Sequence, residues 1–493
     1  MSVIKEQPVK TSLQPSIHPY LNGAWTPLHE EVTATEMQVI GEIPTDIDGV
    51  YVRNTENPVH EALGNYHPFD GDAMIHSISF KEGKAEYRNR FVRTKGFQAE
   101  QEAGKSLWQG IANPVKPDTR PGWGAQGFVK DSSSTDVVIH GGKIMSTFWQ
   151  CGEGYLLDPY TLEQHGTQSW APVDGISAHP KVDENTGEML FFNYSKYPPY
   201  QHYGVVDKNN KLVHYTAVPL PGPRLPHDMA FTKSYSILAD LPMFWDPERI
   251  PENGYHPHYH PDMPSRFAIL PRYGNEADIM WFEAKATYVL HWMNAYQEGD
   301  EIVLYGYFQD QPNPPPLEGL PPGPGKLMAN IDLMSMQTKL HCWRFNLKTG
   351  KTTEEHVDER VLEFGSFNQK FAGIKNRYNY SVYNKPGWFL FSGLVKHDLE
   401  TGESWTLDFG KDRYGSEAPF VPRVNAKDED DGYLVSFITD MKENRSECVL
   451  IDAKDIEAGP VCRIILPHRI SSGTHACWGN GDDIRAAQNN KRA

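Results

Sequence analysis

The segment Gly473-Thr474-His475-Ala476-Cys477-Trp478 is the last of four short histidine phrases that constrain how this 493-residue chain folds. In each phrase, Pro, Gly or small and aromatic residues flank the histidine, as is typical of turns and strand ends that hold a ring in one direction. The other three phrases are Ser177-Ala178-His179-Pro180-Lys181, Leu225-Pro226-His227-Asp228-Met229 and Leu290-His291-Trp292-Met293-Asn294-Ala295. The histidines lie 48, 64 and 184 residues apart, so they form no single local metal-binding unit. If they meet, the fold must be circular or must otherwise bring distant segments together.

Short runs of β-forming residues, bounded by Gly, Pro, Asn and Asp, recur along the chain, and long amphipathic helices are nearly absent. Hairpins at irregular intervals favour an all-β sandwich or propeller over an α/β fold. No WD or kelch repeat identifies a propeller by its period. The predicted strands are 137–145, 189–194, 301–308, 388–394, 433–439 and 448–452, and the predicted hairpin tips are 207–211, 346–351 and 398–403.

Composition limits the classes of partner. The net charge of −17, with no basic run to offset it, argues against nucleic acid. The N-terminus has no apolar signal segment, and no stretch approaches the roughly 18 apolar residues of a membrane span. We therefore expect a cytoplasmic protein, with peripheral contact to a membrane left open. The odd number of cysteines, 5, and the absence of a CxxC motif favour reduced thiols over a disulfide framework.

Two insertions, 242–264 and 311–328, are rich in Pro, Gly and aromatic residues and are too long for tight turns. Loops of this length on a β scaffold usually cover a site or are mobile, so we expect them over the substrate face. The first insertion contains His256, His258 and His260, which alternate as a metal clip would. Because prolines flank them in a loop, we expect a solvated surface segment there and no metal site.

The histidine phrases resemble those of the carotenoid cleavage oxygenases, a family of non-haem iron dioxygenases. The resemblance also includes Pro19-Tyr20-Leu21-Asn22-Gly23, Arg53-Asn54 and Pro68-Phe69-Asp70-Gly71-Asp72, and so extends over nearly the whole chain. It implies that residues 1–493 form a single all-β domain, a seven-bladed β-propeller with long loops capping one face over an axial iron site. Nitrogen ligands alone suit Fe, Cu, Zn and Ni. The resemblance selects Fe(II), held by His179, His227, His291 and His475.

The resemblance also implies a layer of acceptors behind the ligands. Ligating imidazoles usually donate their other N–H to a carboxylate or a carbonyl. Glu363 and Glu417 match two of the family's three glutamates and are expected on His291 and His475. Gln150 stands at the third position, facing His227, where its amide oxygen can accept one hydrogen bond but carries no charge.

The implied reaction is the oxidative cleavage by O2 of a conjugated C=C bond in an apolar carotenoid or apocarotenal, giving two carbonyl products. The nearest alternative is the same reaction on a phenylpropenoid or stilbene. Relatives that cleave aryl alkenes tend to carry a lysine just before the third glutamate, and here Trp149 stands at that position as a candidate for the substrate tunnel. More distant alternatives are a zinc hydrolase, against which the fourth histidine argues, and a non-enzymatic propeller that binds proteins. The sequence leaves the cleaved bond and the oligomeric state open.

Overall fold

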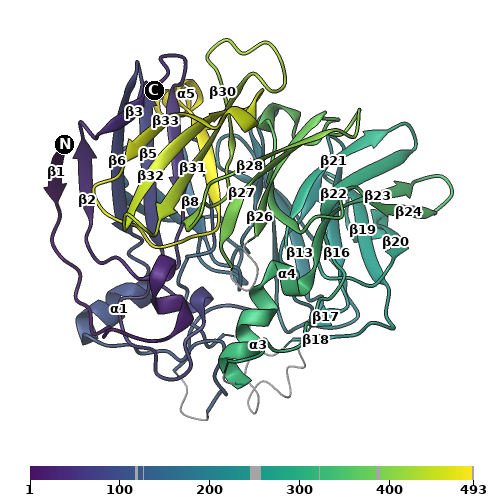
Figure 1. Cartoon of the computed structure of the whole chain (residues 1–493). Helices are drawn as coiled ribbons and strands as arrows, with labels where there is room; N and C mark the ends of the chain where they lie inside the picture. The colour runs from purple at the N-terminus through teal and green to yellow at the C-terminus, as the bar shows by residue number, and fades with distance from the viewer. Residues whose placement is uncertain (117–119, 126, 245–256, 321, 385–388, 491–493) are drawn as a thin grey trace. The chain divides into compact units, whose positions relative to one another are not determined.

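The computed structural model describes the whole chain except residues 117–119, 126, 245–256, 321, 385–388 and 491–493 (Figure 1). Antiparallel sheets dominate the described residues, and seven of those sheets contain at least four strands. The fold is a mainly β, seven-bladed propeller, as the resemblance implied. The chain divides into two compact units: a first unit of Met1–Ala178 with Trp405–Ala493, and a second unit of His179–Ser404.

Within the described ranges, the second unit contains three four-stranded sheets, one two-stranded sheet and three strands of a further four-stranded sheet, whose fourth strand β28 begins at the last residue of the unit. In most of them, strands follow one another along the chain, because short hairpins connect neighbours. The strands are β11 (Lys181–Asp183), β12 (Glu188–Tyr194), β13 (Gln201–Val206) and β14 (Leu212–Ala217); β15 (Ala230–Phe231), β16 (Tyr235–Asp240), β19 (Ser265–Pro271) and β20 (Met280–Ala284); β17 (Met243–Phe244) and β18 (His258–Tyr259); β21 (Trp292–Glu298), β22 (Glu301–Gln309), β23 (Thr338–Asn346) and β24 (Thr352–His356); and β25 (Leu362–Ser366), β26 (Tyr378–Asn384), β27 (Phe391–Asp398) and β28 (Ser404–Asp408).

The first unit contains the other three sheets, and strands from both ends of the chain take part in two of them. The C-terminal strand β34 (Ala476–Asn480) pairs with β4 (Gly49–Arg53), and β33 (Pro460–Ile465) pairs with β3 (Val39–Gly41). This interleaving joins the chain's two ends in shared sheets. The remaining strands are β1 (Ser2–Lys5), β2 (Val32–Thr35), β5 (Met74–Lys81), β6 (Lys84–Phe91), β7 (Asp136–His140), β8 (Lys143–Thr147), β9 (Tyr155–Leu157), β10 (Gln164–Thr167), β29 (Arg413–Tyr414), β30 (Phe420–Pro422), β31 (Gly432–Asp440) and β32 (Arg445–Asp452).

The helices are short. Those in the described residues are α1 (Lys95–Ala103), α3 (Pro322–Ile331), α4 (Leu333–Met336) and α5 (Gly481–Asn490), with 3₁₀ turns η1 (Pro19–Leu21), η2 (Gly23–Trp25), η3 (Pro68–Asp70), η4 (Glu276–Asp278), η5 (Gln369–Phe371) and η6 (Ile456–Ala458). Within the part of the chain that the structure describes, no helix has the length and apolar character needed to cross a bilayer. All five cysteines are free thiols.

The three predicted hairpin tips are confirmed, and they share one construction. At the start of each tip, an Asp or Asn side chain accepts hydrogen bonds from two backbone N–H groups of the tip, as an Asx turn does. A residue with positive φ then reverses the chain, which suits Asn and Gly. The acceptors are Asp207, Asn346 and Asp398, and the positive φ angles are 62° at Asn210, 70° at Gly350 and 77° at Gly402.

Packing between neighbouring sheets explains why several strands are buried on both faces. In the second unit, side chains of the β15–β20 and β21–β24 sheets share one core, in which Phe267, Trp292 and Trp343 meet through tilted and edge-to-face rings. Aromatic pairs of this kind add about 0.5–1.5 kcal/mol beyond their buried area. Strand β22 is buried along nearly its whole length. Because the sheet β21–β24 is covered on both faces, its first strand β21 is held firmly in place.

Several local predictions need correction. The run 137–145 is not one strand but the hairpin β7–β8, because Gly141 and Gly142 both adopt positive φ and form its tip. The second half of the 311–328 insertion is helical, since α3 begins at Pro322, and proline is well accepted in the first turn of a helix. In the 242–264 insertion, β17 pairs with β18, while residues 245–256 and the expected cover over the substrate face lie outside the described residues.

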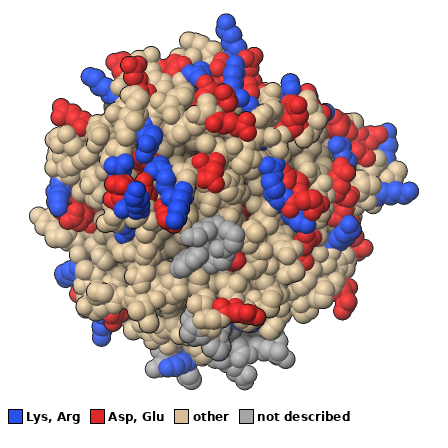
Figure 2. Space-filling model, viewed as in Figure 1, with Lys and Arg blue, Asp and Glu red and all other residues tan. Residues whose placement is uncertain are grey.

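Acidic and basic side chains are mixed on the face that Figure 2 shows. On the face shown in Figure 2, basic side chains lie beside acidic ones and do not gather into a patch of one sign. Exposed ion pairs such as Lys454–Asp428 and Lys375–Glu298 set opposite charges side by side. This face therefore offers no basic surface for a phosphate backbone.

Candidate metal centre

His179, the first residue of the second unit, has a strained backbone. Its φ of 63° lies in the left-handed region, which costs a non-glycine residue roughly 1–2 kcal/mol. Pro180 follows it and β11 begins at Lys181. Strain of this kind persists where the surrounding structure determines the conformation, and it is concentrated at functional sites. The direction of the His179 ring is thus set by its backbone.

His227 and His291 also lie at or just before the first strand of a sheet. His227 lies three residues before β15 (Ala230–Phe231), and His291 immediately precedes β21. The carbonyl of His291 accepts a hydrogen bond from Tyr307 N at 3.2 Å. A Cβ at Gly306 would come within 2.5 Å of the Trp292 ring, so glycine is needed for the close approach of β22 to this segment. The ring of His291 therefore projects from a closely packed strand end.

His475 immediately precedes β34 in the first unit. Its carbonyl accepts a hydrogen bond from Asn54 N at 3.0 Å, which continues the pairing of β34 with β4 beyond the strand. A Cβ at Gly473 would lie 2.6 Å from the carbonyl oxygen of Asn54. Glycine at 473 therefore allows this segment to approach β4, and the Arg53-Asn54 motif contributes the surface that it contacts.

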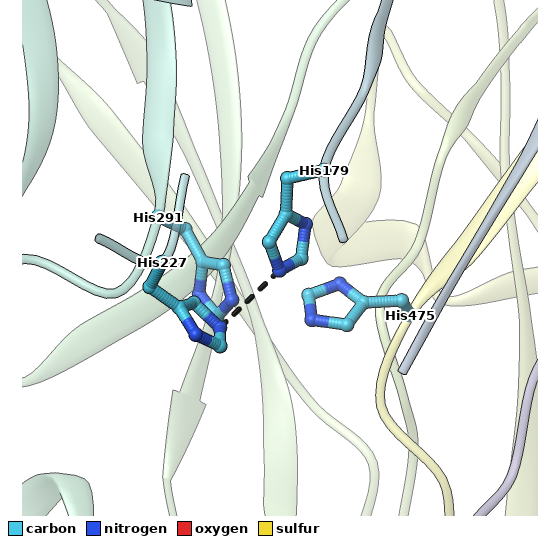
Figure 3. Close-up of side chains that lie close together, drawn as sticks. All are labelled: His179, His227, His291 and His475. Atoms are coloured by element: carbon cyan, nitrogen blue, oxygen red, sulfur yellow. Dashed lines mark hydrogen bonds between the residues drawn. The ribbon is translucent and has the colours of Figure 1, made fainter. Parts of the chain in front are cut away.

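The four histidines form one cluster (Figure 3). Each ring offers one nitrogen, and these four nitrogens lie within 4.8 Å of one another. The Nε2 atoms of His179 and His227 are 3.2 Å apart, and none of the four histidine residues is more than 7% exposed. Four buried imidazoles whose nitrogens converge on one point form a four-His metal site.

Glu363 lies behind His291. Its Oε2 accepts a hydrogen bond from His291 Nδ1 at 2.7 Å and from the backbone N of Phe364 at 2.6 Å, and Glu363 is completely buried. The Phe364 ring packs on His291 with 4.6 Å between ring centroids. A carboxylate on Nδ1 fixes the proton there, which leaves the lone pair of Nε2 for a metal.

Glu417 makes the corresponding contact with His475 at a longer distance. Its Oε2 lies 3.3 Å from His475 Nδ1 and accepts a hydrogen bond from Ala476 N at 2.9 Å, while the Glu417 side chain remains 17% exposed. Burial alone would lower the pKa of His475, but the hydrogen bond to Glu417 and its charge outweigh burial, so the pKa is raised. Glu417 therefore favours a proton on the Nδ1 side of this ring.

Sequence reasoning missed a further carboxylate near His475. Glu56 is 3% exposed, and its Oε1 accepts a hydrogen bond from the Thr474 hydroxyl at 3.3 Å. Burial raises the pKa of Glu56 to about 7. Arg53, also buried, donates to the Ser471 carbonyl at 2.6 Å. Glu56 follows the Arg53-Asn54 motif by two residues, which was the available signal.

Trp149 and Gln150 lie in a tight turn after β8. In this turn Cys151 N donates to the Phe148 carbonyl at 3.0 Å, and Cys151 has a φ of 70°. The Trp149 ring is 7% exposed and packs edge-to-face against Phe69 and Phe148. Gln150 is fully buried, and its side-chain amide forms no hydrogen bond within the described residues. Its contact with His227 remains a prediction.

The alternating histidines of the first insertion are not part of a metal cluster among the residues that the structure describes. His258 is exposed on β18, and His260 stacks on Phe244 with 4.2 Å between ring centroids. His256 lies outside the described residues. The exposed His258 agrees with the prediction of a surface segment.

The donor set fits a divalent transition metal. Four neutral imidazole nitrogens suit Fe, Cu, Zn or Ni, and four ligands leave up to two positions of an octahedron open. The carboxylates of Glu363 and Glu417 accept hydrogen bonds from the Nδ1 atoms of His291 and His475. They therefore orient these rings without occupying a coordination position.

Comparisons with known proteins agree with this fold and site. The sequence model of the family described as "Retinal pigment epithelial membrane protein" matches residues 25–480. The carotenoid 9,10(9',10')-cleavage dioxygenase 1 of Arabidopsis thaliana is 32% identical, covering 94% of this chain and 90% of the relative. The isoeugenol monooxygenase of Pseudomonas nitroreducens is 30% identical, covering 93% of this chain and 98% of the relative.

Solved structures share the architecture. The lignostilbene dioxygenase of Pseudomonas brassicacearum has a TM-score of 0.82 at 24% identity, covering 95% of this chain and 100% of that chain. A cobalt-substituted apocarotenoid oxygenase of Synechocystis has a TM-score of 0.82 at 25% identity, covering 93% of this chain and 98% of that chain. The chain is therefore similar over nearly its whole length to proteins named for carotenoid, apocarotenoid and aryl-alkene substrates.

Proposed function

The chain belongs to the retinal pigment epithelial membrane protein family, which includes the carotenoid cleavage oxygenases, and we propose that it uses Fe(II) and O2 to cleave a carotenoid or apocarotenal. It is an alkene-cleaving oxygenase with a four-His metal site. The observation that carries the proposal is the convergence of four buried imidazoles, two of which have a carboxylate on Nδ1.

The proposed reaction converts one conjugated C=C bond and one O2 into two carbonyl groups. The double bond is broken, and each carbon gains one oxygen atom of O2, so no further reductant is needed. Bound Fe(II) would supply the redox chemistry that activates O2. The protein then has to bind the alkene, orient it and exclude water.

Each carboxylate has a specific task in this proposal. Glu363 holds the Nδ1 proton of His291, and Glu417 holds that of His475, so that both rings present Nε2. Gln150 is proposed to face His227 with a neutral amide. The centre then carries one negative charge fewer than a centre with three glutamates.

The choice of substrate class rests on Trp149. A phenolic substrate needs a polar partner for its hydroxyl, since burying that group unpaired costs roughly 1–3 kcal/mol. Trp149 instead adds indole surface beside Phe69 and Phe148, which suits an apolar polyene if these rings line the substrate tunnel.

An aryl alkene is the second candidate substrate. The 30% identity with isoeugenol monooxygenase over 98% of that relative is close to the 32% identity with the carotenoid dioxygenase, so overall similarity does not separate the two classes.

Contact with a membrane surface, from which an apolar polyene would be taken up, also belongs to this proposal.

The test is product analysis by mass spectrometry. The iron-loaded protein is incubated under ¹⁸O2 with a panel of apocarotenals, resveratrol-like stilbenes and isoeugenol-like alkenes, and kcat/KM is measured for each. We expect cleavage of the polyene, with label in both carbonyl products. Trp149→Lys is the matched variant and should move the preference toward phenolic alkenes. A clear preference of the parent for a phenolic alkene would overturn the substrate class. Purified protein that contains zinc in place of iron would overturn the reaction.

A further inference from the structure

Asp228 immediately follows the ligand His227, and both of its carboxylate oxygens are used. Oδ1 accepts a hydrogen bond from Met229 N at 2.7 Å and pairs with Lys181 Nζ at 2.7 Å. Oδ2 accepts a hydrogen bond from Trp292 N at 2.8 Å. The Asp228 side chain is 1% exposed. A carboxylate this deeply buried is retained only where charge and hydrogen bonds compensate its lost hydration.

The partners of Asp228 belong to three segments that carry ligands. Lys181 lies two residues after His179, Met229 two residues after His227, and Trp292 one residue after His291. Those segments lead into β11, β15 and β21, which begin three different sheets. In addition, the Asp228 carbonyl accepts a hydrogen bond from Trp292 Nε1 at 3.3 Å, which doubles the connection to the His291 segment.

This arrangement differs from that of a carboxylate that only stabilises one hairpin. Asp398 has similar chemistry: it is 2% exposed, pairs with Arg377, and accepts the backbone N–H groups of Glu400 and Thr401. All of its backbone partners lie in the tip that follows β27. Asp228 instead bonds to residues up to 64 positions away along the chain, each near a histidine of the cluster.

We propose that Asp228 is a positioning residue that holds the segments of His179, His227 and His291 at the separation that one metal ion requires. The proposal rests on the proposed iron centre, and it assigns to Asp228 no contact with substrate or metal. Since His475 belongs to the first unit, Asp228 organises only the three histidines of the second unit.

The experiment compares Asp228→Asn with the control Asp398→Asn in the full-length protein. Fe(II) affinity is measured anaerobically against a chromophoric chelator, and Co(II) is used as a spectroscopic probe of ligand geometry. Loss of a group that bonds directly to a metal ligand typically weakens affinity about 10–100-fold, and Asp228, which bonds to the neighbours of the ligands, is expected toward the lower end of that range. We expect that loss in Asp228→Asn, together with a changed Co(II) visible spectrum, whereas Asp398→Asn should keep the parent affinity and spectrum even if its melting temperature falls.

Lys181→Gln is the second variant, because Lys181 is 26% exposed and its replacement leaves the Asp228 bonds to Met229 and Trp292 in place. It should shift the Co(II) spectrum and weaken Fe(II) binding less than Asp228→Asn does. The proposal would be overturned if Asp228→Asn kept the parent's affinity and spectrum, or if Asp398→Asn changed them equally. If Asp228→Asn does not fold, parent-like affinity and spectrum in Lys181→Gln would overturn it. Failure of the parent to bind Fe(II) would instead overturn the proposed function.

Discussion

Replacing Glu363 by Gln should weaken iron binding more than replacing Glu417 by Gln. Glu363 is 0% exposed and lies 2.7 Å from His291 Nδ1. The Glu417 side chain is 17% exposed and lies 3.3 Å from His475 Nδ1. A shorter bond in a drier environment loses more when its charge is removed.

The magnitude follows from the change in the hydrogen bond. A hydrogen bond to a charged group contributes about 1.5–3 kcal/mol and a neutral one about 1 kcal/mol. Glu363→Gln therefore costs roughly 0.5–2 kcal/mol, which corresponds to about 2- to 30-fold in Fe(II) affinity, because 1.4 kcal/mol is about tenfold. The amide oxygen of Gln can still accept from Phe364 N, so the fold should be kept. For Glu417→Gln we expect the lower end of this range.

The assay is an anaerobic Fe(II) titration against a chromophoric chelator, with thermal melting of each variant to verify that the fold is intact. The expected order of affinity is parent, then Glu417→Gln, then Glu363→Gln. The reasoning is refuted if Glu417→Gln costs as much affinity as Glu363→Gln, or if neither variant changes it. Burial and distance would then not govern how much these two carboxylates contribute to Fe(II) binding.

Three further predictions follow from other residues. Replacing any one of His179, His227, His291 and His475 by Ala should remove most of the bound iron in elemental analysis, with His258→Ala as the unaffected control; full iron occupancy in two of the four variants contradicts the ligand set. Gln150→Glu adds a negative charge that stabilises Fe(III) over Fe(II), so a redox titration should give a lower potential, and an unchanged or higher potential with intact fold argues against its placement. Burial lowers the pKa of His468 from 6.5 to about 4. The unfolded chain therefore binds the proton first, and the contribution of His468 to stability should fall as the pH drops from about 7 to about 4. His468→Gln should flatten this dependence of Tm, and a pH profile equal to the parent's would refute the assignment.

The sequence supplied strands and turns but not the number of blades. Hairpin tips are readable because one Asp or Asn and one residue with positive φ specify them within a few positions. The closed ring of blades depends on strand pairings that no local sequence pattern contains, such as that of Arg53 with Ala476. From the residues alone, a sandwich and a propeller both stayed open, and the family resemblance of the histidine phrases separated them.

The strand predictions failed where glycine or proline changed the local structure. Gly141-Gly142 between two apolar runs is a recognised hairpin signal, so the division of 137–145 into β7 and β8 was within reach of the sequence. The helix α3 was not, because Pro322 and the glycines of that insertion also fit an irregular loop.

At the metal centre, the resemblance pointed to Glu363 and Glu417, whereas Asp228 and Glu56 needed the structure. Asp228 stands inside a quoted phrase, yet its partner Trp292 lies 64 residues further along the chain. Glu56 contacts Thr474, which is 418 residues away. Contacts across such separations follow from the completed fold, so they cannot be read from spacing.

The origin of the fourth ligand links the metal centre to the completion of the fold. His475 immediately precedes β34, and its carbonyl is held by Asn54, next to the β4 strand with which β34 pairs. The ring can contribute its nitrogen only after the C-terminal strand has paired with the N-terminal sheet. A ligand that binds only the folded form stabilises it by about 2.7 kcal/mol at a free concentration of 100 times Kd. On the proposed ligand set, a metal that takes His475 together with the other three histidines would link its binding to the pairing of the two chain ends, so that each favours the other.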